Sequence, residues 1–212
     1  GIYAADDNPA SVGIDVYNSG GIIVYSHSDT AGAISAGILV NASGNADISN
    51  TGNLSITSYG AQDATSGGIV ATAYSSVNVD NDGTLSVTAS NYSAAQYDSA
   101  YAYGILAQGD DVLVENSGVI SVAAYAYDAE WTIARAIGIY TGSDHSAAID
   151  NTGDIDVFAA NDGDVGASRA YGIFAESEYA ITIGNSGDID IAGTSGGGFY
   201  LNYYDQIYLA GD

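Results

Sequence analysis

Four aspartates occupy matching positions in two similar stretches of the chain. Asp154 and Asp156 belong to Asn-Thr-Gly-Asp-Ile-Asp, and Asp188 and Asp190 belong to Asn-Ser-Gly-Asp-Ile-Asp. Carboxylate oxygens are the ligands that Ca²⁺ prefers, and two carboxylates at a fixed separation supply the acid and base of glycoside hydrolysis. If the four side chains lie together, these stretches predict either cation binding or polysaccharide hydrolysis.

The other reactive residue types form no catalytic motif. The chain has no cysteine, which excludes thiolate metal sites, disulfides and thiol nucleophiles. Its two histidines are His27 and His145, and serine and aspartate are too frequent for a Ser-His-Asp pattern to carry information. The sequence therefore favours a protein that is not an enzyme, with a polysaccharide hydrolase that uses the Asp pairs as the alternative.

Charge narrows the choice of partners. The chain has 26 acidic residues against two basic ones, for a formal net charge of -24. Nucleic-acid binding requires basic side chains, and anionic membrane surfaces are disfavoured for the same reason. No apolar run approaches the length of a membrane span, so we expect no direct membrane insertion in this segment. Self-repulsion of this size indicates a saline or calcium-containing exterior.

A repeat positions the aspartates. An Asn-x-Gly tripeptide recurs at intervals of 31 to 35 residues, and a Gly-Ile pair recurs between its copies. Apolar and polar residues alternate around Asn-x-Gly, which is the period of a strand. Each unit therefore predicts three short strands and a variable, Tyr-rich loop of roughly ten residues that ends at Gly-Ile. The asparagines that open the tripeptides are Asn18, Asn50, Asn81, Asn116, Asn151 and Asn185.

Strands this short bury a face only if identical units stack, each strand pairing with its counterpart about 4.8 Å away. The sequence therefore predicts an all-β fold, a right-handed parallel β-helix (β-solenoid) of about six to seven three-stranded rungs. It predicts a single domain over residues 1–212 without an internal boundary. The chain begins and ends within the repeat, so we expect a fragment of a longer protein.

The alternation of Ile-x-Asn-x-Gly-x-Ile motifs with Ala-x-Gly-Ile strands resembles the passenger domains of bacterial autotransporters and related exported adhesins. Asn151-Thr152-Gly153 and Gly138-Ile139 are examples of the two motifs. The resemblance covers essentially the whole chain. It implies a parallel β-helix on the bacterial cell surface or outside the cell, with a structural or adhesive role.

In-register stacking assigns neighbours to particular side chains. The six asparagines would form a ladder of hydrogen-bonded amides with a structural role, and the glycines two residues on would provide either a positive φ or close backbone approach. Asp154 would lie beside Asp188, and Asp156 beside Asp190. Like charges in that position are destabilising, so we expect either a bound Ca²⁺ or carboxylates that splay into water.

The Gly-Ile strand is apolar on both faces, which predicts an outward apolar stripe. Either the long loops cover this stripe or it binds another copy or a partner. Tyrosine is enriched where proteins bind proteins or sugars, so the aromatic residues Tyr92, Tyr97, Tyr127 and Trp131 of the loops are further candidates. The expected partners are a host or cell-surface receptor, or the protein itself in a filament or lateral contact. The stripe residues are Tyr3, Leu39, Val70, Leu106, Tyr140 and Phe174.

Overall fold

The computed structural model describes residues 1–6, 8, 13–92, 98–127, 132–162, 166–195 and 203–210, and all regular structure in these ranges is β-strand. This confirms the predicted all-β parallel solenoid. The strands are β1 (Ile2–Asp6), β2 (Gly13–Asn18), β3 (Ile22–Ser28), β4 (Ala33–Ala42), β5 (Asn45–Asn50), β6 (Leu54–Gly60), β7 (Ala64–Ala73), β8 (Ser76–Asn81), β9 (Leu85–Asn91), β10 (Ser99–Asn116), β11 (Ile120–Ala126), β12 (Thr132–Asn151), β13 (Ile155–Asn161), β14 (Gly166–Ser177), β15 (Ala180–Asn185), β16 (Ile189–Ser195) and β17 (Tyr203–Ala210).

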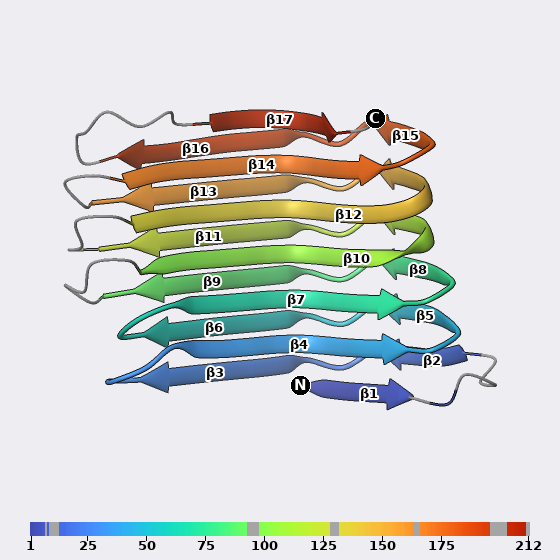
Figure 1. Ribbon diagram of the computed structural model, residues 1–212, viewed down its shortest axis with the longest axis horizontal. Coiled ribbons are helices and arrows are strands. Elements are labelled where there is room, and N and C mark those ends of the chain that lie inside the picture. Colours follow the sequence, from blue (N-terminus) through green and yellow to red (C-terminus); the bar gives the residue numbers. More distant parts are fainter. Residues whose placement is uncertain are drawn as a thin grey trace.

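Two sheets of parallel strands enclose the core (Figure 1). Sheet A has eleven strands: β1, β4, β7, β10, β12, β14 and β17 form its main face, and β2, β5, β8 and β15 continue it around one corner beside the ends of β10 and β12. Sheet B has six strands in the order β16-β13-β11-β9-β6-β3. The strands of sheet B run opposite to those of the main face of sheet A (Figure 1).

The solenoid makes about five turns, slightly fewer than the six to seven rungs predicted. β1 and β17 form the two edges of the main face of sheet A. The molecule is longest along its strands and not along the solenoid axis (Figure 1).

Inward ladders of identical or similar side chains form the core. The isoleucines of the Gly-Ile pairs face one another on successive turns and are completely buried. Full burial of one such side chain contributes about 1.5–3 kcal/mol, so the ladder stabilises every turn that it crosses. These core residues are Ile38, Ile69, Ile105, Ile139 and Ile173.

The main-face strands of sheet A begin earlier than the sequence predicted. β10 starts at Ser99 and β12 at Thr132, so the residues just before Gly-Ile belong to the sheet and not to a variable loop. The alternation slips by one residue at the Gly-Ile pairs from Gly37-Ile38 to Gly172-Ile173, where both residues are buried. Glycine is required there because a Cβ on Gly138 would overlap the Ile155 side chain of sheet B.

The six asparagines form a continuous ladder at the corner between the two sheets. The Nδ2 atom of Asn81 donates to Oδ1 of Asn116 at 2.7 Å, and Asn116 donates to Asn151 at 2.7 Å. Each of these side chains also donates to the carbonyl of the glycine two residues on, as Asn116 does to Gly118 at 3.0 Å. The ladder ties each turn to the next, and its four inner amides are buried.

Close backbone approach explains the glycine of each Asn-x-Gly. Among the described glycines only Gly13 has a positive φ, so the tripeptides do not depend on a left-handed residue. A Cβ on Gly118 would instead overlap the carbonyl oxygen of Gly83 one turn away. A side chain there would push neighbouring turns apart.

Replacing Asn116 by alanine should lower the free energy of unfolding by about 3 kcal/mol, because it leaves the buried Asn151 Oδ1 without a donor and one of the two N–H groups of Asn81 Nδ2 without an acceptor. Asn185→Ala is the matched control: Asn185 lies at the last position of the ladder, is exposed and donates to no other asparagine of the described ranges, so its loss leaves no buried oxygen without a donor and should cost about 1 kcal/mol. Denaturant unfolding measures both. Equal losses would show that the ladder does not couple the turns.

Candidate functional site

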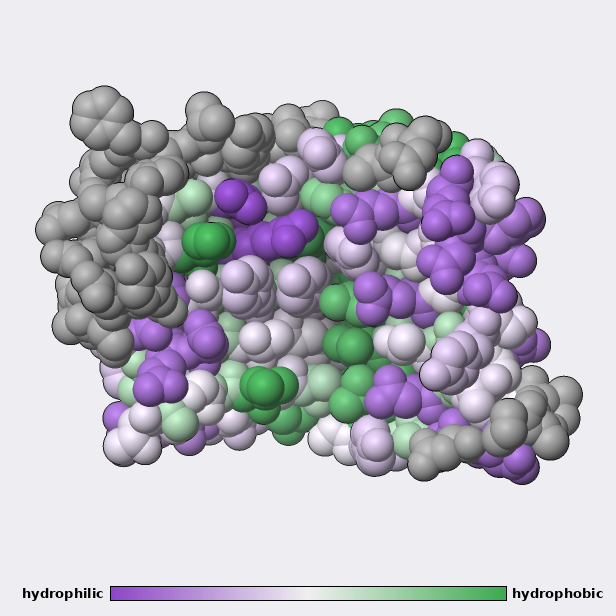
Figure 2. All heavy atoms as spheres, viewed as in Figure 1, coloured by the Kyte–Doolittle hydropathy of each residue, from purple (hydrophilic) through white to green (hydrophobic). Residues whose placement is uncertain are grey.

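The outer face of sheet A carries the predicted apolar stripe in register. Strand pairing joins its six residues into one ladder and adds Tyr208 of β17 at the end. We call these seven residues the apolar ladder: Tyr3, Leu39, Val70, Leu106, Tyr140, Phe174 and Tyr208. Figure 2 shows hydrophobic side chains gathered in a column near the middle of this face. Exposure is 68% at Tyr3, falls to 6% at Phe174 and is 39% at Tyr208, the last residue of the ladder.

Aromatic neighbours from the same sheet cover the ladder over β12 and β14. The Phe174 ring lies 5.4 Å from Tyr140 and 5.1 Å from Tyr171, measured between ring centroids. Ile137 and Tyr171 belong to the next outward position along the strands and form a second small core with Phe174, against which Tyr103 also packs. Adjacent outward positions of sheet A therefore cover this end of the ladder.

Both arginines of the protein lie beside this aromatic cluster. Arg135 pairs in register with Arg169 on the next turn. The Arg135 Cζ atom lies 5.7 Å from the ring centroid of Tyr171 and 5.2 Å from that of Phe174, which is the range of a cation–π contact. Stacking on the rings holds this guanidinium against the outer face of sheet A.

A polar groove of about 390 Å³ borders the cluster on its other side. The Tyr140 hydroxyl donates to Glu176 at 2.7 Å in the wall of this groove. Burial, reinforced by the Glu176 carboxylate, raises the pKa of Tyr140 to about 12. The groove combines ring faces with hydroxyl, amide and carboxylate groups, which are the groups that recognise saccharide hydroxyls and ring faces. Its other polar residues include Tyr74, Gln108, Asp110 and Asp144.

Two of the four predicted loop aromatics are described, and they lie at the same end of sheet B. Tyr92 is 39% exposed and Tyr127 is 38% exposed. Tyr127 stacks on Tyr125, with ring centroids 6.1 Å apart. The predictions for Tyr97 and Trp131 concern positions outside the described residues.

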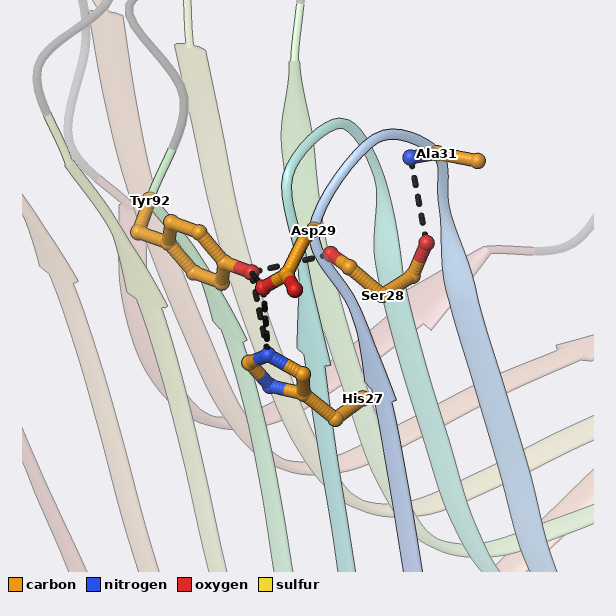
Figure 3. Close-up of polar contacts among 5 residues, drawn as sticks. All are labelled: His27, Ser28, Asp29, Ala31 and Tyr92. Atoms are coloured by element: carbon orange, nitrogen blue, oxygen red, sulfur yellow. Dashed lines mark hydrogen bonds and ion pairs between the residues drawn. The ribbon is translucent and has the colours of Figure 1, made fainter.

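Tyr92 closes a small polar cluster at the end of β3 (Figure 3). His27 Nε2 lies 2.7 Å from Asp29 Oδ1, and the Tyr92 hydroxyl donates to the Ser28 carbonyl at 2.9 Å. Hydrogen bonds from His27 and then Tyr92 hold the pKa of Asp29 below its ordinary value. Both the Asp29 carboxylate and the Tyr92 hydroxyl approach the same imidazole nitrogen, whereas a catalytic triad needs a different nitrogen for each partner. The cluster ties the end of β3 to the segment after β9.

The second histidine lies in a comparable arrangement. His145 Nδ1 lies 2.8 Å from Asp111 Oδ1, and the Ser146 hydroxyl donates to that same carboxylate oxygen. The serine therefore supports the aspartate and does not face the imidazole as a nucleophile would. These two bonds, with Ser146 first, lower the pKa of Asp111.

The four aspartates all lie exposed at the start of β13 and β16. Asp156 pairs in register with Asp190, and the Asp188 backbone N–H donates to the Asp154 carboxylate at 3.4 Å. Asp156 and Asp190 also line a groove of about 500 Å³ with Tyr125. Among the described residues, no three histidine, cysteine or acidic side chains are grouped so as to hold a metal ion. Ca²⁺ binding here stays a prediction.

Sequence reasoning missed the residues beside the apolar ladder, namely Tyr103, Arg135, Tyr171 and Arg169. It assigned their segments to variable loops. A signal was available in Ala-x-Ala-x-Gly-Ile, as at Ala134-x-Ala136, because alternating small residues before Gly-Ile already have the period of a strand.

Comparisons with protein-family models, with curated proteins and with solved structures give no match. The described ranges contain no helix that is long and apolar enough to cross a membrane.

The Tyr140 phenol should titrate at about 12. Since a raised pKa stabilises the folded state below the ordinary value of 10.0, this contribution should be lost as the pH rises from there toward 12. The ultraviolet absorbance difference between wild type and Tyr140→Phe measures the titration. Glu176→Gln should shift it downward. If the Tyr140 phenol titrates near the ordinary value in both the wild type and Glu176→Gln, the buried Tyr140–Glu176 contact is contradicted.

Proposed function

We propose that the chain is an extracellular structural or adhesive surface protein of a bacterium, similar in role to autotransporter passengers and exported adhesins. The observation that carries this proposal is the apolar ladder on the outer face of sheet A. A contiguous apolar stripe on an outer face is typical of an interface. The stiff solenoid is the scaffold, and the ladder with its neighbouring grooves is the contact surface.

Two kinds of partner are consistent with this surface. One is a host or cell-surface receptor, for which the groove beside Tyr140 and the exposed rings of Tyr92 and Tyr127 are contact points. The other is a second copy of the protein, in a filament or a lateral contact. The exposed half of the ladder, around Tyr3 and Leu39, supports both.

Polysaccharide hydrolysis is the second candidate function. It is favoured by the groove in which Asp156 and Asp190 lie beside Tyr125 and Phe158, because aromatic rings and carboxylates together bind sugars. We rank it second since both carboxylates are exposed, whereas a general acid at neutral pH needs a pKa raised by burial.

A double substitution of Val70→Ser and Leu106→Ser in the ladder tests the proposed function. Both side chains point outward, so folding should persist while adhesion of protein-coated beads to cell monolayers, or self-association measured by sedimentation, weakens by about tenfold per residue. Val119→Ser is the control, because Val119 is 40% exposed but lies outside the ladder.

Three outcomes would contradict the proposal. The first is a ladder variant that adheres and associates like wild type. The second is a wild-type protein that neither adheres nor associates. The third is release of reducing sugar ends from polysaccharides by the wild type, which would favour the hydrolase.

A further inference from the structure

The two arginines of the protein occupy the same position on neighbouring strands. Arg135 of β12 and Arg169 of β14 are in-register neighbours on the outer face of sheet A, about 4.8 Å apart along the backbone. Like charges in this position are destabilising. The chain has 26 acidic residues, so each arginine could have had a carboxylate as its neighbour, yet the two arginines lie side by side.

Neither arginine is neutralised within the described part of the chain. The ion pairs there are those of His27 with Asp29 and of His145 with Asp111. Among the described residues, the Nε atoms of both arginines are buried and lack a hydrogen-bond partner. Within the described residues, both guanidinium groups therefore have no ion-pair partner, and each Nε atom keeps an unused hydrogen-bond donor.

Sheet B carries the opposite arrangement in the same two turns. Asp156 of β13 and Asp190 of β16 are in-register neighbours and both are exposed. Across the core, Gly138 of β12 lies against Ile155 of β13. Because β12 and β13 run in opposite directions (Figure 1), Arg135 and Asp156 are offset by only about two residues along the strands, or about 6.6 Å. The two like-charged pairs therefore lie almost back to back.

We propose that the arginine pair of one copy binds the aspartate pair of a second copy, with sheet A of one molecule facing sheet B of the next and their turns level. Both pairs have the spacing of one strand, so each guanidinium meets one carboxylate in the geometry of a charge-assisted, two-bond contact. With the copies oriented alike, Phe158 of the second copy faces the half-buried Ile133 of the first. Each like-charge repulsion is then replaced by an attraction.

This contact is head-to-tail, so it leaves one free sheet on each outer copy and continues into a layered stack. It rests on the proposed surface role and names the second copy as the partner for lateral association. Ionic strength decides whether it forms. At about 0.15 M salt the screening length is about 8 Å, which weakens the long-range repulsion between chains of charge -24 more than the direct contact.

Complementary charge reversal tests the proposal. R135E/R169E makes both faces acidic, and D156R/D190R makes both faces basic. Each variant alone should self-associate at least about a hundredfold more weakly than wild type in sedimentation at physiological salt, because like charges then meet at the interface. An equimolar mixture should recover association in alternating order, since each acidic face meets a basic one.

Circular dichroism checks the folding of both variants. D156R/D190R alters only exposed side chains, so it provides a second test. Its sheet A still binds sheet B of a wild-type molecule, but its own sheet B binds no further copy. When it is added to the wild type, it should therefore terminate the stacks and shorten them. D15R/D47R is the matched control, because it reverses another in-register Asp pair, on β2 and β5, and should not shorten the stacks.

Several results would overturn the inference. They are a monomeric wild type, association of either variant at wild-type strength, or a mixture that stays dissociated. Loss in R135E/R169E without recovery in the mixture would assign the arginines to a different anionic partner. Adhesion that still depends on Val70 and Leu106 would leave the proposed function intact in each case.

Discussion

The fold depends on parallel, in-register pairing between successive turns about 4.8 Å apart. This constraint places each residue beside the residue at the same position of the next unit. Small differences in unit length fall in the connections or at the register shift between β10 and β12 near Gly109, so the ladders remain aligned through intervals of 31 to 35 residues. Isoleucine can then stack on isoleucine in the core and asparagine on asparagine at the corner.

The same constraint acts on the outer faces, where it brings together residues that are not needed for folding. Apolar residues stack into the ladder that ends in Phe174 and Tyr208. Charged residues stack as well, which places Arg135 beside Arg169 and Asp156 beside Asp190. When a solenoid has the same type of residue at one position of each turn, these side chains form a continuous row on its surface. Such a row is suited to binding an extended partner.

The repeat made the fold and the register predictable. Counting from each Gly-Ile pair was sufficient to place Leu106 opposite Tyr140, and counting from each Asn-x-Gly placed Asp156 opposite Asp190. What counting did not reveal was the strand before each Gly-Ile, since the alternation slips where Gly138 and Ile139 both face the core. The arginines lie in that strand, so their position was not predicted. The sequence also did not decide between a positive φ and close backbone approach for the Asn-x-Gly glycines, because the distance to the next turn is a property of the folded structure.

Cysteine cross-linking tests the in-register stacking most directly, and the chain has no cysteine of its own. Ser86 of β9 pairs with Ser121 of β11, both pointing outward, at a separation of about 4.8 Å that a disulfide can span. Oxidation should cross-link Ser86→Cys/Ser121→Cys rapidly and leave Ser86→Cys/Ala123→Cys, which is two residues out of register, reduced. Preferential cross-linking of the second pair, or of neither pair, would contradict the stacked solenoid.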